Sequence, residues 1–169
     1  MSVTIARPIS ERIAVAVFER LQLLLAGYSK HFTASEVVRP LRNGGFTPQH
    51  LQIVMTQSAP ELVQELMCPG NPPALAYQTQ FNIRCHVMPS ERDPTPVDEF
   101  VNVMAAEVQR VVTDDSYLTY LWHTMDNLAI NSEWQTHENI ESDGSFDGVN
   151  VPLLVTYRVS ENDPFEVRA

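Results

Sequence analysis

The chain of 169 residues carries 21 acidic and 11 basic side chains, which gives a net charge of −10 at pH 7. Tight binding to DNA or RNA needs clustered Lys and Arg, and the chain has no basic patch or tail, so a nucleic-acid-binding regulator is disfavoured. Hydrophobic residues make up 44% and charged residues 19%, as in an ordinary globular domain. A chain of this length buries roughly 70% of the surface of its unfolded state and needs no metal or disulfide to fold.

The cysteines and the N-terminus indicate a reducing compartment. Cys68 and Cys85 form no C-x-x-C pair, and two unlinked thiols are expected, with a disulfide between them as the alternative. Residues 1–8 contain no signal-peptide core, and no apolar run approaches the roughly 20 residues of a membrane span. We therefore expect a soluble protein that is intracellular where it is made.

The N-terminal part predicts a helix and two strands. Residues 9–27 carry apolar side chains at helical spacing, with Ser10 as the expected N-cap. A short strand is predicted around Val37 and Val38, and a second strand over residues 50–56.

The clearest strand is predicted over residues 76–88, because apolar and polar side chains alternate strictly there. The apolar set is Tyr77, Thr79, Phe81, Ile83, Cys85 and Val87, and the polar set is Gln78, Gln80, Asn82, Arg84 and His86. This pattern favours an antiparallel sheet with one buried and one more polar face.

A second helix is predicted from Pro96 to about residues 113–115. Thr95 is the expected N-cap, and Asp98 and Glu99 fall in the first turn, where carboxylates are favourable.

The last third predicts a hairpin. A strand over residues 128–134 is followed by an acidic, glycine-containing turn at 141–148 and a last strand at 149–159. Pro152 cannot donate to a ladder, so this strand is expected at an edge or with a bulge there. The tail, residues 161–169, is expected to leave the fold.

Together these elements predict one α+β domain over residues 1–169, a mostly antiparallel sheet of about four strands with two main helices packed on one face. Long loops are expected at about residues 39–49 and 57–75, and a short extended C-terminal tail at 161–169. Loops of that length without secondary structure are usually functional or disordered, and contact with partners is the use that we expect.

No catalytic, metal or cofactor site is predicted. The chain has no nucleophile elbow, P-loop or dinucleotide fingerprint, and no histidine pair at metal-binding spacing. A metal site that joins His123, His137 and Glu138 to Glu133 stays open, although nothing in the spacing requires it. Trp134 also has two open interpretations, as a core residue or as part of a protein contact surface.

The order of elements resembles the tail-terminator and tail-completion proteins of tailed bacteriophages, with the related neck proteins nearby. Three features carry the resemblance: the helix that begins Ile-Ser-Glu-Arg-Ile-Ala, the long strand, loop and helix over 77–112, and the strand at 151–159. That strand ends in Thr-Tyr-Arg with an Asp-Pro exit. The resemblance covers residues 9–165 and is one of layout, without an invariant motif. Residues 57–75 are longer and more proline-rich than the family pattern, and 115–125 are more aromatic.

The resemblance implies a non-enzymatic structural protein of the virion neck or tail, made in the host cytoplasm. Such proteins form a homo-oligomeric ring, commonly a hexamer, at the head-proximal end of the tail. The ring ends polymerisation of the tail tube and joins the tail to the head connector. The implied partners are therefore other copies, the tail tube protein and the connector or neck proteins. DNA passes through the lumen without specific binding, and no cofactor or membrane is involved.

Two groups of residues are predicted to contact partners. Arg39, Arg42 and Phe46 form the first, and Glu133, Trp134 and Glu138 form the second. Within the same class, the alternatives are a head-completion or adaptor protein of the neck and a minor tail protein. A more distant alternative is a small enzyme or ligand-binding domain with a pocket between helix and sheet.

Overall fold

A computed structural model describes residues 6–25, 31–40, 48–88, 95–113, 129–142 and 145–167. These residues form two α helices, one 3₁₀ helix and an eight-stranded sheet. In chain order the elements are α1 (Ile9–Gln22), β1 (Glu36–Val38), β2 (Gln52–Gln57), β3 (Glu61–Leu62), η1 (Gln64–Leu66), β4 (Ala74–His86), α2 (Val97–Thr113), β5 (Asn131–Trp134), β6 (Glu138–Ser142), β7 (Ser145–Ser160) and β8 (Asp163–Val167).

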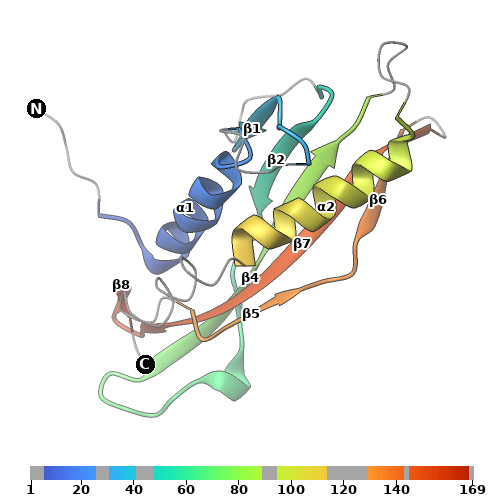
Figure 1. The fold of residues 1–169 in the computed structure, drawn as a ribbon. Coiled ribbons are helices and arrows are strands. Elements are labelled where there is room, and N and C mark those ends of the chain that lie inside the picture. Colours follow the sequence, from blue (N-terminus) through green and yellow to red (C-terminus); the bar gives the residue numbers. More distant parts are fainter. Residues whose placement is uncertain are drawn as a thin grey trace, which may run out of the picture.

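The long strands β4 and β7 are the centre of the sheet (Figure 1). The strand order is β1-β2-β4-β7-β5, with β3 also pairing with β4, and β6 and β8 also pairing with β7. β4 pairs with β7 along its whole length, from Ala74 opposite Ser160 to His86 opposite Gly148. On its other side β7 contacts three short strands in turn. β1 and β2 are parallel, and the other pairs are antiparallel.

The prediction of about four mostly antiparallel strands is therefore wrong, since the sheet is mixed and has eight strands, although the chain is still roughly α+β. β3 has two residues and β5 has four. Such short segments show too little alternation to be recognised, and they become strands by pairing with β4 and β7. The parallel pairing of β1 with β2 depends on a crossover between them, which local periodicity does not reveal.

Both helices lie on one face of the sheet and bury the apolar residues of β4 and β7 (Figure 1). Phe81 lies opposite Leu153, and Ile83 lies opposite Val151, all at 1% exposure or less. Each such side chain contributes roughly 1.5–3 kcal/mol when it is fully buried. None of the described helices is both long enough and apolar enough to cross a membrane.

The start of α1 differs from the prediction. Pro8 is the N-cap residue, with φ −63° and ψ 161°, and its carbonyl oxygen accepts hydrogen bonds from the amides of Glu11 and Arg12, both at 3.0 Å. Ser10 lies inside the first turn. The fixed φ of proline holds the chain as it enters the helix, and the buried Ile9 anchors the first turn. α2 ends at Thr113, as predicted, and begins at Val97, one residue after the predicted start.

Pro152 lies inside the sheet, at the break between β5 and β6, where the register with β7 shifts by one residue, from Trp134 opposite Leu153 to Glu138 opposite Asn150. Its carbonyl oxygen accepts a hydrogen bond from Gln135 N at 2.9 Å. A strand residue directs its N–H and C=O to the same side, so the missing donor faces the gap between β5 and β6. No bond to β4 is lost, and proline is tolerated there.

The C-terminal segment also differs from the prediction. After a turn at residues 161–162, β8 folds back and pairs with β7, with Val159 opposite Val167. The Asp-Pro pair of the predicted exit therefore begins a strand, and residues 163–167 do not leave the fold.

Candidate functional site

The face of the sheet opposite α1 and α2, called the helix-free face below, carries no helix in the described part of the chain (Figure 1). Its side chains come from the alternate positions of the strands that do not enter the core. They include Gln78, Gln80, Asn82 and Arg84 of β4, Asn150, Pro152, Leu154, Thr156 and Arg158 of β7, Glu133 of β5 and Glu138 of β6. Amide, hydroxyl and charged groups predominate, which suits a wet contact with another protein more than a second core.

Hydrogen bonds between side chains connect the strands across this face. Asn82 Oδ1 accepts from Gln80 Nε2 at 2.9 Å and from Asn150 Nδ2 at 3.1 Å. Asn150 Nδ2 also lies 3.3 Å from Glu138 Oε2, which connects β7 to β6. Asn150 is 7% exposed; its Nδ2 donates to Asn82 and Glu138, whereas its Oδ1 is buried without a hydrogen-bond partner. The network fixes the amide orientations and therefore presents a preorganised polar surface.

The structure brings two of the six predicted contact residues together. Glu133 lies opposite Leu154, and Glu138 lies opposite Asn150, so both carboxylates are exposed on the helix-free face. They belong to β5 and β6, which form one edge of the sheet. In each case the register with β7 determines the face on which the carboxylate lies.

Trp134 lies on the other face of β5. It is opposite Leu153, and its side chain is partly buried against the core under the helices. This packing agrees with the interpretation of Trp134 as a core residue, and its contact with a partner stays a prediction.

Arg39 lies far from that edge, just after β1, and its guanidinium forms a bidentate ion pair with Glu11 of α1. Both N···O distances are 2.7 Å, and the side chains are 31% and 35% exposed. The hydrogen bond from Arg39 lowers the pKa of Glu11, and the same bond raises the pKa of Arg39. Arg39 therefore joins α1 to the sheet. Arg42 and Phe46 lie outside the described residues.

The titratable groups form no catalytic arrangement among the described residues. Burial raises the pKa of the Cys85 thiol to about 12, which leaves it protonated and unreactive. Burial, together with the charge of Arg84, lowers the pKa of His86. No group of three or more metal-binding side chains occurs in the described segments.

The metal site suggested as an alternative is not assembled by its described members. His137 Nε2 lies 2.9 Å from Gln109 Nε2 of α2, whereas Glu133 and Glu138 are on the helix-free face. His123 is outside the described residues. The sheet therefore lies between the His137 ring and the carboxylates.

Sequence reasoning missed two parts of the molecular surface. It identified the polar face of β4 but not the connections from Asn82 to Asn150 and Glu138, because these depend on pairing between distant strands. It also missed the close approach of Tyr77 and Tyr157, whose rings stack with centroids 6.0 Å apart. The sequence shows only that both tyrosines occur at core-facing positions of alternating strands, which does not predict that they meet.

Comparison with known proteins leaves the family open. No protein-family model matches the chain, and no curated protein matches its sequence.

Proposed function

We propose that this protein is a structural assembly protein that closes into a ring at the head-proximal end of a bacteriophage tail. In this role it ends polymerisation of the tail tube and joins the tail to the head connector. The class comes from the likeness in element order to tail-terminator and tail-completion proteins. The fold supports it through one observation in particular, an open sheet with a polar, preorganised face and two different edges.

The two edges suit a ring because a ring needs head-to-tail contacts between unlike surfaces. β1 has a single neighbour, β2, within the described residues, and β5 lies at the opposite end of the strand order. Pairing of β5 of one copy with β1 of the next would continue the sheet around the ring. Such pairing gains backbone hydrogen bonds that an isolated copy leaves to water.

The charge of the subunit suits a passage for DNA. In this arrangement the helix-free faces line the lumen and the helices lie outside. The exposed carboxylates of Glu133 and Glu138 then add to the field of a chain with net charge −10, and a negative wall repels phosphate. Arg84 and Arg158 also lie on this face, so the negative field of the lumen would come from the net charge of the chain and not from an absence of basic groups.

The oligomeric state tests the proposal. Light scattering across a concentration series, with negative-stain images of the same fractions, should detect closed rings, either alone or after addition of purified tail tubes. Rings that cap the tubes support the proposal. A strict monomer that ignores tubes and connectors contradicts it, and small-molecule ligands should then be examined.

A proline at Ser132 tests the edge contact. The amide of Gln135 points to β7, and so does that of Glu133, because directions alternate along a strand. The amide of Ser132 therefore points to the open edge. Ser132→Pro removes this donor without breaking the pairing of β5 with β7 and should prevent ring closure. Ser132→Ala keeps the amide and is the matched control, expected to assemble as the wild type does. Equal assembly of the two variants contradicts pairing at this edge.

A further inference from the structure

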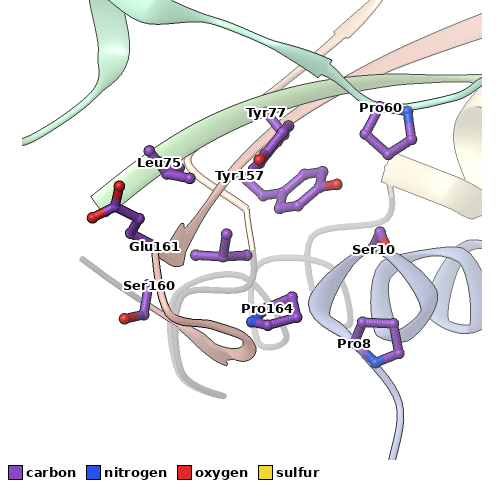
Figure 2. Close-up of a pocket in the computed structure, with 10 residues that line it drawn as sticks. Pro8, Ser10, Pro60, Leu75, Tyr77, Tyr157, Ser160, Glu161 and Pro164 are labelled. Atoms are coloured by element: carbon purple, nitrogen blue, oxygen red, sulfur yellow. The ribbon is translucent and has the colours of Figure 1, made fainter. Parts of the chain in front are cut away.

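An apolar groove of about 380 Å³ lies at the end of the sheet where β4 begins and β7 ends (Figure 2). Its floor is formed by the stacked rings of Tyr77 and Tyr157, with centroids 6.0 Å apart and planes inclined by 28°. The first turn of α1 forms one wall, through Pro8 and Ser10, and the turn from β7 to β8 forms another.

The groove exists because the core stripe of the sheet is longer than the helices that cover it. Farther along β4, Phe81 and Ile83 are fully buried, whereas Leu75 and Tyr77 are half-buried. Leu62 of β3 lies opposite Tyr77 and is 47% exposed. An apolar row therefore continues past the covered core to the surface, in the manner of a binding groove.

The walls are fixed before any ligand arrives. Pro8, Pro60 and Pro164 line the groove, and a proline ring restricts φ, so little entropy remains to be lost there. Ser160 also lines the groove, and its hydroxyl is buried at 2% exposure without a hydrogen-bond partner.

The charged residues around the groove indicate which charge a ligand should carry. Glu161 lines the groove, and Glu61, Asp163 and Glu166 are exposed on β3 and β8 at the same end of the sheet. The described basic groups at this end are Arg7, before α1, and Arg158, whose Nε donates to the carbonyl of Leu66 at 2.9 Å. Carboxylates therefore predominate around the groove, and they complement a ligand with positive charge.

We propose that this groove binds an extended, proline-containing segment of a partner protein, with Arg or Lys beside the prolines. Aromatic-lined grooves recognise such segments because the polyproline II helix is already extended and loses little entropy on binding. The stacked tyrosines would contact the proline rings, and the carboxylates would attract the basic residues. The inference does not depend on ring formation, since every residue that it uses belongs to one copy.

The first test uses a synthetic probe, a fluorescein-labelled peptide of Pro-Leu-Pro repeats flanked by arginines. Fluorescence anisotropy should show saturable binding tighter than about 1 mM, weakened by salt. Two control peptides separate the contribution of the proline rings from that of the positive charge. One has glycine in place of proline, and the other has glutamate in place of arginine. Both should bind at least about tenfold more weakly.

Protein variants locate the binding site. Tyr77→Ala should weaken binding at least about tenfold, because it removes half of the aromatic floor. Glu161→Arg lies in an exposed turn, so it should fold normally and still weaken binding by about threefold or more. Leu66→Ala is the control, since this side chain is 38% exposed at the same end but does not line the groove. Amide shifts on titration should cluster at Ser10, Ser160 and Glu161.

Three results would overturn the proposal. These are the absence of binding up to about 1 mM, equal binding of the glycine peptide, and unchanged affinity of both groove variants. None of them bears on the ring, which is tested by oligomeric state. If the protein forms a ring but does not bind the peptide, the proposed function stands and only the proposal for the groove is contradicted.

Discussion

Replacing Gly148 with alanine tests the close contact between β4 and β7. Gly148 lies opposite His86 and has φ +147°, a backbone conformation that side chains strongly disfavour. A Cβ atom built there would lie 2.0 Å from the carbonyl oxygen of Cys85 and 3.2 Å from the Cα of His86. Both neighbours are backbone atoms of β4, so no side-chain rotation relieves the clash.

Two costs combine in this variant. A residue forced into a glycine-only region of φ and ψ costs about 1–3 kcal/mol, and overpacking that moves the backbone typically costs about 1–3 kcal/mol more. The free energy of unfolding of Gly148→Ala should therefore fall by about 2–6 kcal/mol. The total free energy of unfolding of a domain is about 5–15 kcal/mol, so this variant would lose a large part or all of its stability.

Urea unfolding followed by far-ultraviolet circular dichroism measures the effect. Gly70→Ala is the matched control, because a Cβ at Gly70 would lie 3.1 Å from the Pro72 carbonyl oxygen in an exposed loop, without a positive φ. The control should lose less than about 1 kcal/mol, as surface substitutions usually do. A loss of less than about 1 kcal/mol for Gly148→Ala, or an equal loss for both variants, would refute the reasoning.

Three further predictions concern the core, the thiols and the ion pair. Phe81→Ala removes a fully buried ring and should lower the free energy of unfolding by about 3–5 kcal/mol in the same urea assay; a loss under about 1 kcal/mol would contradict the packing. With a thiol reagent, Cys68 should react in the native protein, whereas Cys85, with a pKa of about 12, should react only after unfolding; two fast thiols would contradict this. A double-mutant cycle with Glu11→Gln and Arg39→Met should give a coupling of at most about 1 kcal/mol at pH 7, because both side chains are about one third exposed. Since Arg39 lowers the pKa of Glu11, this stability is fully present above the ordinary carboxyl pKa of 4.5 and is lost as pH falls through the lowered value. A coupling that persists in strong acid would be inconsistent with an ion pair.

The long elements could be predicted because their signals are local. Strict alternation over 76–88 identified β4, which spans Ala74–His86, and apolar spacing together with Asp98 and Glu99 identified α2. In each case the pattern of apolar residues lies within a single segment, so it can be recognised without knowledge of the segments that pack against it. The predicted hairpin was only partly right, because β6 reaches Ser142 and β7 begins at Ser145, so most of the turn predicted at 141–148 is strand.

The remaining features depend on contacts between distant segments. β3 and β8 are strands only because β4 and β7 offer free edges, and the parallel pairing of β1 with β2 depends on the path of the crossover. At the candidate site, neighbours at 133 and 134 divide between the two faces of β5, so a cluster assigned from sequence proximity was separated by the pleat. The groove needs Tyr77 beside Tyr157, and no local pattern places them together.

The pairing of β4 with β7 also determines when the protein can fold during synthesis. β4 is complete at His86, but its partner is complete only at Ser160. At about 5–20 residues per second, the ribosome needs roughly 4–15 s to make the intervening chain. During this time β4 lacks its main pairing partner, and its apolar side chains are not yet covered. A chaperone that holds extended apolar segments would have time to bind. The central pair of strands, and with it the sheet, can therefore form in full only after Ser160 has been synthesised.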